Sequence, residues 1–183
     1  MKTTGSSLLC VIAVSLLGIS AVSLRGQAGA MGAMDEHAHA AAPVSTGLTL
    51  TIHGKATKLS LADLEAMPQT TVAVHNEHTK MDESYTGVLL GALLAKYGFP
   101  VDKTTHQTML RSYLVVEGTD KYWVLYSVTE IEGSEHNDDV IVATSMGGKP
   151  LGADGQLKLV DSGDKRPQRW VRNLASITVK SAE

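Results

Sequence analysis

The chain has 183 residues, of which 43% are hydrophobic and 19% are charged, and its formal net charge is −3. This composition is typical of a globular protein and argues against a largely disordered one. The length suits one domain with a core large enough to fold alone. The small negative charge gives no general electrostatic case for binding nucleic acid.

The N-terminal residues have the layout of a secretory signal. Lys2 precedes an apolar run over residues 8–22, and small residues including Ala28-Gly29-Ala30 follow it. An A-x-A sequence at this place is typical of a signal cleavage site, so we expect residues 1–30 to be removed, with cleavage after Ser23 as the alternative. Because the apolar run is short for a membrane span, we expect export to the periplasm or the medium without a stable membrane anchor.

The only cysteine, Cys10, lies in this expected signal. The mature chain is therefore predicted to have no disulfide, no thiolate nucleophile and no cysteine-ligated metal. Residues 31–46 contain small residues without an apolar period, which predicts a flexible leader. We expect residues 47–183 to form the domain.

The domain opens with apolar residues that alternate with polar ones over 48–53, the period of a half-buried strand. A turn at Gly54 leads to a second predicted strand over 57–59. Ser60 has the spacing to cap a short helix that ends before Pro68.

The stretch 70–98 is the centre of the predicted fold. Small and β-branched residues over 71–74 predict a strand, which runs into the polar residues His75, Asn76, Glu77 and His78. After this loop, an apolar stripe over 88–94 predicts a helix that ends at Gly98. A polar loop held between two buried elements is a common place for binding residues. The alternative interpretation is a solvated turn.

The second half of the chain is predicted to be mostly strands. Aromatic and β-branched runs over 113–116 and 122–126 predict a β-hairpin. Further strands are predicted at 140–143, 157–159 and 177–179, with a glycine turn at residues 147–150.

The strongest local charge in the chain lies between residues 164 and 173. It comes from four cations: Lys165, Arg166, Arg169 and Arg172. If a helix begins at Pro167, Arg169 and Arg172 share one face and grip an anion, while Trp170 faces the core. The alternative is that these cations form surface ion pairs, which contribute little to stability.

Three motifs stand out: Tyr85-Thr86-Gly87-Val88, Gly148-Lys149-Pro150-Leu151 and Trp170-Val171-Arg172-Asn173-Leu174. In this order, the chain over 48–179 resembles the molybdopterin-binding domain of the sulfite oxidase type. The resemblance implies an α+β fold with mixed β-sheets and a few short helices. It also implies a molybdopterin cofactor whose metal is held by a cysteine in the loop before the first motif.

No cysteine stands in that loop, and counting back from Tyr85 puts the family's thiolate position at about His75. We therefore consider His75 and His78 as a neutral imidazole pair that binds a divalent transition metal. Both rings reach one side only if the loop turns helically, since residues three apart in a strand point to opposite faces. The alternative is that one histidine caps the strand and the other is solvated.

Two functions follow from these observations. The first is an exported molybdopterin-dependent redox enzyme, or the cofactor-bearing subunit of one, whose redox partner the sequence does not identify. Its cofactor would lie between the His75 loop and the basic segment, against His75, Asn76, Lys165, Arg166, Arg169 and Arg172. The second is a non-catalytic binding module of the same fold that uses this cleft for a small anion or a metal ion. The missing cysteine favours the second function, and the resemblance favours the first.

Overall fold

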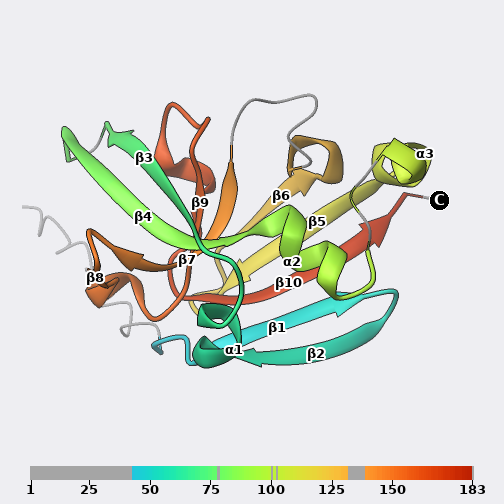
Figure 1. The fold of residues 1–183 in the computed structure, drawn as a ribbon, viewed down its shortest axis with the longest axis horizontal. Coiled ribbons are helices and arrows are strands. Elements are labelled where there is room, and N and C mark those ends of the chain that lie inside the picture. The colour runs from blue at the N-terminus through green and yellow to red at the C-terminus, as the bar shows by residue number, and fades with distance from the viewer. Residues whose placement is uncertain (1–42, 78, 100, 102, 132–138, 183) are drawn as a thin grey trace, which may run out of the picture. The chain divides into compact units, whose positions relative to one another are not determined.

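The fold is that of a computed structural model, which describes residues 43–77, 79–99, 101, 103–131 and 139–182. The strands of this part of the chain form two sheets (Figure 1). The first sheet has the order β2-β1-β10-β5-β6, and its β1–β10 pair is parallel while its other pairs are antiparallel. Its strands are β1 (Gly47–Ile52), β2 (Lys55–Ser60), β5 (Ser112–Gly118), β6 (Trp123–Ser127) and β10 (Leu174–Ser181).

The second sheet is antiparallel and has the order β3-β4-β7-β8, with β9 also paired to β7. Its strands are β3 (Thr70–Asn76), β4 (Met81–Leu89), β7 (Val140–Met146), β8 (Lys149–Pro150) and β9 (Lys158–Asp161). The helices are short: α1 (Leu61–Glu65), α2 (Leu90–Lys96), α3 (His106–Leu110) and the 3₁₀ turns η1 (Lys103–Thr105), η2 (Val128–Ile131), η3 (Gly152–Asp154) and η4 (Pro167–Arg169). The predicted α+β class is confirmed.

Several elements form where the local sequence predicts them. In β1 the residues alternate between buried and half-buried, as their period requires. At the start of α1 the Ser60 hydroxyl accepts the Asp63 N–H at 3.2 Å, and the Asp63 carboxylate accepts the Ser60 N–H at 2.8 Å. This reciprocal capping box satisfies two backbone donors at the helix start. The 113–126 hairpin is also confirmed, as β5 and β6.

The predicted polar loop and helix of the central stretch are wrong in part. β3 and β4 pair as a hairpin that closes with Asn76 opposite Met81, and the helix begins at Leu90, not at Val88. Val88 and Leu89 belong to β4 because they pair with Val142 and Ile141 of β7. Neighbouring strands thus override the helical spacing of these apolar residues.

The glycine of the first motif is explained by this pairing. A Cβ atom on Gly87 would lie 2.1 Å from the carbonyl oxygen of Val142, closer than any side chain tolerates. Gly87 is therefore required by the close contact of β4 with β7.

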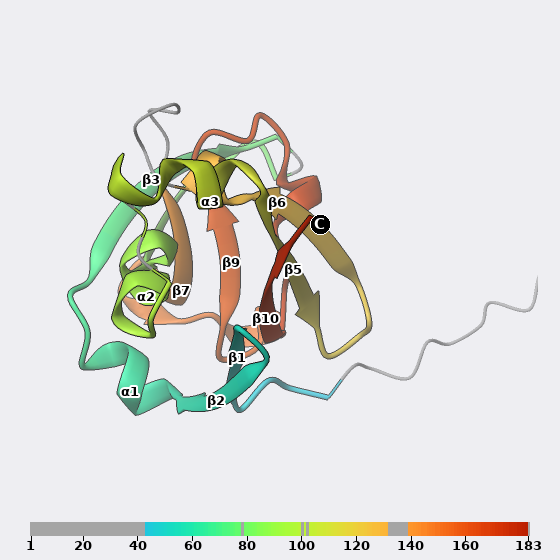
Figure 2. The same cartoon turned by 90° about the vertical axis from the view of Figure 1, so that its right-hand side faces the viewer.

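The main core lies between the two sheets (Figure 2) and includes buried residues of both, among them Leu50, Leu114, Val142 and Leu159. A smaller core cluster contains Tyr85 and Trp170 together with strand residues of the second sheet. The position of Trp170, 5% exposed, confirms that it is a core residue. None of the described helices is both long and apolar enough to cross a membrane.

The predicted signal over residues 1–30 lies outside the described residues. Of the predicted leader, only residues 43–46 are described, and they are attached to the domain. The Ser45 N–H donates to the side chain of Asn173 at 3.1 Å, and the Thr119 hydroxyl donates to the Pro43 carbonyl at 2.5 Å. The domain thus begins a few residues earlier than its first strand.

Candidate functional site

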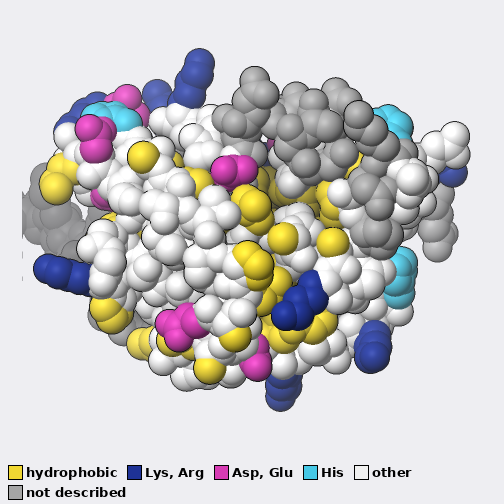
Figure 3. Space-filling model, viewed as in Figure 1, with side chains coloured by type: hydrophobic (Ala, Val, Ile, Leu, Met, Phe, Trp, Pro, Cys, Tyr) yellow, Lys and Arg dark blue, Asp and Glu magenta, His cyan; other side chains and the backbone are white. Residues whose placement is uncertain are grey.

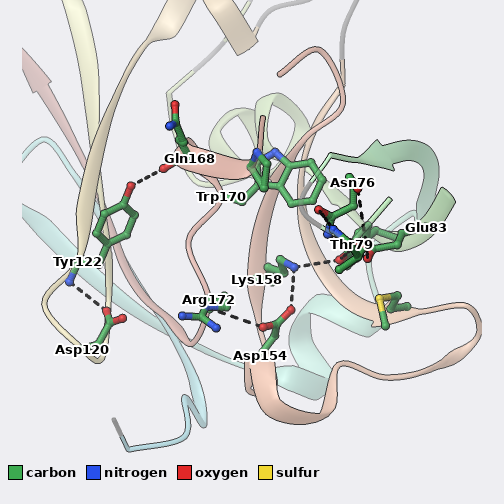
Figure 4. Close-up of a pocket in the computed structure, with 13 residues that line it drawn as sticks. Asn76, Thr79, Glu83, Asp120, Tyr122, Asp154, Lys158, Gln168, Trp170 and Arg172 are labelled. Atoms are coloured by element: carbon green, nitrogen blue, oxygen red, sulfur yellow. Dashed lines mark hydrogen bonds and ion pairs between the residues drawn. The ribbon is translucent and has the colours of Figure 1, made fainter. Parts of the chain in front are cut away.

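On the face of the molecule seen in Figure 3, the coloured charged side chains of both signs are scattered and do not gather into one large patch. A cavity of about 570 Å³ is the better candidate for a site, since small-molecule pockets have volumes of about 300–1,000 Å³. It lies between the β3–β4 hairpin, the β5–β6 turn, the start of β9 and the segment 167–172 (Figure 4). Its lining residues are Asn76, Thr79, Glu83, Tyr85, Asp120, Tyr122, Met146, Asp154, Lys158, Pro167, Gln168, Trp170 and Arg172.

Lys158 is the buried cation of this cavity, with 7% of its side chain exposed. Its Nζ donates to Asp154 Oδ2 at 2.7 Å and to the Tyr85 hydroxyl at 2.9 Å. The same Nζ lies 4.6 Å from the centre of the Tyr85 ring and 5.3 Å from that of Trp170. The carboxylate and the two ring faces offset the cost of burying an ammonium group.

A hydrogen-bonded carboxylate lies on the hairpin side of the cavity. Glu83 accepts the Asn76 amide at 3.0 and 3.1 Å, the Thr79 hydroxyl at 3.1 Å and the Tyr85 hydroxyl at 2.7 Å. Burial raises the pKa of Glu83, but the hydrogen bonds from Tyr85, Asn76 and Thr79 outweigh this effect, so the pKa is lowered overall. Burial and the neighbouring Glu83 raise the pKa of Tyr85. Tyr85 therefore stays protonated and links Glu83 to Lys158.

Arg172 is more exposed than Lys158. Its side chain is 67% exposed, and its Nε lies 3.9 Å from Asp154 Oδ1. Asp154 therefore faces two cations, Lys158 through one oxygen and Arg172 through the other (Figure 4). On the other side, the Asp120 carboxylate accepts the Tyr122 N–H at 3.0 Å, and the Tyr122 hydroxyl donates to the Gln168 carbonyl.

The predicted helix over the basic segment is wrong. Only Pro167–Arg169 form a 3₁₀ turn, and the backbone is extended at Trp170, so Arg169 and Arg172 do not share a helix face. The 3₁₀ turn ends because Trp170 is held in the core: its Nε1 donates to the Asp161 carbonyl at 3.1 Å, and its ring packs edge-on against Tyr85 at 5.8 Å.

Arg169 does not line the cavity. Its guanidinium donates to Asp164 at 2.7–3.2 Å, to Asp161 at 3.1 Å and to Glu130 at 3.0 Å. It also lies 4.4 Å from the centre of the Tyr126 ring. The hydrogen bonds to Asp164 raise the pKa of Arg169. The printed contacts place three carboxylates around the single charge of Arg169, so Arg169 belongs to an ion-pair cluster and does not line the cavity together with Arg172.

Asn76 and His75 lie on opposite faces of β3. Val72, Val74 and Asn76 are buried, whereas His75 is exposed, as strand alternation requires. Asn76 lines the cavity, but His75 does not: its Nδ1 lies 2.7 Å from the Asp82 carboxylate at the surface. His78 is outside the described residues, so the metal pair stays a prediction. Among the residues that are described, no three His, Cys, Asp or Glu side chains are grouped for metal binding.

Lys165 and Arg166 also lie outside the cavity lining, and both are exposed. Arg166 lines a smaller cavity of about 410 Å³ together with Glu77, Lys80, Pro167 and Gln168. Of the six predicted cofactor-binding residues, the structure thus brings Asn76 and Arg172 to the main cavity.

Sequence reasoning missed Lys158, Tyr85, Glu83 and Asp154 as site residues. Lys158 stands between Leu157 and Leu159, and strand alternation alone would place it in solvent. All four residues of β9 are buried, however, because both faces of this strand are covered. The spacing of Glu83 and Tyr85, two apart in a strand, was the one signal that they share a face.

The fold is similar to that of a solved structure, the sulfane dehydrogenase SoxCD from Paracoccus pantotrophus. The sequence identity is 18% and the TM-score is 0.59, and the match covers 78% of this chain and 41% of that chain. The chain thus spans less than half the length of that protein, and the likeness concerns the fold alone. A search of curated proteins found no matching sequence.

A family model described as the oxidoreductase molybdopterin binding domain matches residues 39–156. The match covers most of the chain and ends before β9, so Lys158, Trp170 and Arg172 lie beyond it. This match shows that the chain belongs to the oxidoreductase molybdopterin-binding domain family.

Proposed function

We propose that the chain is an exported binding module of this family, and that it holds a small ligand in the main cavity without a thiolate-bound metal. The observation that carries the proposal is Lys158, a buried ammonium group that faces a cavity of about 570 Å³. Burying a lysine is costly unless it is paired, and Lys158 is held beside the cavity by Asp154 and the Tyr85 hydroxyl.

The residues around the cavity do not fit a metal held by a cysteine. The only cysteine of the chain is Cys10, which lies before the matched residues 39–156. The one sulfur in the cavity lining is the thioether of Met146, which is a weak ligand for hard or high-valent metals. The other lining groups are carboxylates, amides, hydroxyls, an ammonium, a guanidinium, the Trp170 indole and the Pro167 ring.

The second candidate is a molybdopterin-dependent oxidoreductase, which the family match favours. In that case the cofactor's anionic groups would meet Arg172 beside Asp154, with the exposed Lys165 and Arg166 nearby in sequence. The two cations that line the cavity already share Asp154, so a phosphate would compete with this carboxylate.

The test is to purify the full chain from the exported fraction of its native host and to measure molybdenum, pterin fluorescence and intact mass. We expect less than a tenth of an equivalent of molybdenum and pterin. We also expect a mature chain that begins at Met31, or at Leu24. Stoichiometric molybdenum and pterin would overturn the proposal in favour of the oxidoreductase. Retention of residues 1–30 would overturn export by signal cleavage.

A metal-ion ligand is tested separately, since it depends on His75 and His78. Titration of zinc and copper into the chain is compared with the same titration of His75→Ala. Weaker binding by the variant would assign the ion to His75, whereas equal binding would remove His75 from the ligands.

A further inference from the structure

Glu83 and the two cations Lys158 and Arg172 line the same cavity, and they differ in the hydrogen bonds that they can still offer a ligand. From this difference we infer that the ligand is a small organic monoanion, whose carboxylate accepts hydrogen bonds from Lys158 and Arg172. Its apolar body would lie against the rings of Trp170 and Tyr122. The inference rests on the proposed function, namely that this cavity holds a ligand.

Glu83 offers little to a ligand. A carboxylate has about four acceptor positions. Glu83 accepts the Asn76 amide at both oxygens, the Thr79 hydroxyl at Oε1 and the Tyr85 hydroxyl at Oε2. Its capacity is thus used within the protein. A ligand rich in N–H donors would find no vacant acceptor at Glu83.

The side chains of Lys158 and Arg172 have N–H groups to spare. The Lys158 ammonium has three N–H groups, and among the described residues it has two acceptors, Asp154 and the Tyr85 hydroxyl. The guanidinium of Arg172 has five N–H groups, and its contact with Asp154 at 3.9 Å is longer than a hydrogen bond. One ligand oxygen can therefore accept a hydrogen bond from the third N–H of Lys158, while a second oxygen accepts one from the Arg172 guanidinium.

The charges around Asp154 indicate a monoanion. Around Asp154 alone, Lys158 and Arg172 leave one positive charge over, whereas the described lining as a whole, with Glu83 and Asp120, carries one net negative charge. Glu83 and Asp120 line the same cavity and would repel a second negative charge on the ligand. A carboxylate matches this balance better than a dianionic phosphate or sulfate does.

The size and walls of the cavity indicate that the anion is organic. An inorganic oxyanion would leave most of the volume of about 570 Å³ to water. Trp170, Tyr122 and Met146 supply aromatic and thioether surface to the lining. Such surface favours the apolar part of a ligand, because its burial removes apolar area from water.

The inference is tested by calorimetric titration of the full chain with acetate, hexanoate and benzoate, and with the neutral amide of each. Sulfate serves as the inorganic anion. We expect hexanoate or benzoate to bind at least tenfold more tightly than acetate, and at least tenfold more tightly than its own amide.

Variants locate the head group. Lys158→Met and Arg172→Gln are each expected to weaken carboxylate binding at least tenfold, whereas Lys58→Met, at an exposed position of β2 outside the cavity lining, leaves binding unchanged. Arg172→Gln changes a largely exposed side chain, so it stays informative if Lys158→Met fails to fold. Equal binding of acid and amide, or unchanged binding by Arg172→Gln, would overturn the carboxylate site.

The two proposals fail in different ways. If sulfate displaces every carboxylate, or if none of the three carboxylates binds, the organic monoanion is overturned. The binding module itself is judged by a different measurement, native mass spectrometry of the chain purified from its host. A co-purified ligand of any other class would keep the module and reject the monoanion, whereas molybdenum and pterin would reject both.

Discussion

Arg169 and Lys158 both lie near Trp170, and their surroundings differ in one respect. Arg169 meets three carboxylates, those of Glu130, Asp161 and Asp164, which together outnumber its charge. Lys158 meets one carboxylate and keeps an unused donor among the described residues. The number of acceptors around a cation, and not its place in a basic run of sequence, thus decides whether it supports the fold or faces a ligand.

The largest expected effect comes from removing Trp170, whose ring lies beside Lys158 and whose indole N–H donates to the Asp161 carbonyl. Trp170→Ala should lower the free energy of unfolding by about 3 to 5 kcal/mol, the range for deleting a large buried aromatic side chain. Urea unfolding measures this change. Trp123→Ala is the matched control, because Trp123 is 58% exposed and should cost less than about 1 kcal/mol. Similar losses in the two variants would contradict the core position of Trp170.

The next largest effect is a difference in the free energy of unfolding between variants of Arg169 and of Arg172. Arg169→Met should cost roughly 2 kcal/mol, because it removes the ion pair of Arg169 with Asp161, whose side chain is 7% exposed. The figure is set below that of a fully buried pair because Arg169 itself is 36% exposed. Arg172→Met should stay within about 0.5 kcal/mol of the native chain. Comparable denaturation curves for both variants would show that the Arg169 cluster is not a structural element.

A smaller effect concerns the link between Glu83 and Lys158. Tyr85→Phe removes the hydroxyl that bonds both groups and should cost about 1 kcal/mol or slightly more, since the buried Lys158 and the half-buried Glu83 each lose a hydrogen bond. Tyr97→Phe is the control, because no hydrogen bond of its hydroxyl is seen within the described part of the chain. If Tyr85→Phe unfolds at the same urea concentration as the native chain, the link contributes nothing to stability.

The smallest effect is a pH dependence. The folded pKa of Glu83 lies below its ordinary value of 4.5, so its contribution to stability is present above about pH 4.5. This contribution is lost as the pH falls through the folded pKa. Glu83→Gln should therefore flatten the decline of stability below pH 4.5, whereas Glu65→Gln, at an exposed position of α1, should not. Parallel declines in all three proteins would assign the acid sensitivity to other groups.

Short-range patterns in the sequence determined much of this fold. The alternation in β1, the Ser60 capping box and the glycine turn before β8 were predictable, because each depends on residues a few positions apart. The resemblance also led to the correct family and fold class.

Only the tertiary structure decided which side chains meet in the cavity. Pairing with β7 keeps β4 a strand as far as Leu89. Alternation along β3 turns His75 outward, while Asn76 lines the cavity. Burial of β9 on both faces brings Lys158 to Asp154 and Tyr85, which are 4 and 73 residues away in sequence. These contacts could not be predicted from periodicity, because a period indicates which face a residue shares but not which distant strand covers that face.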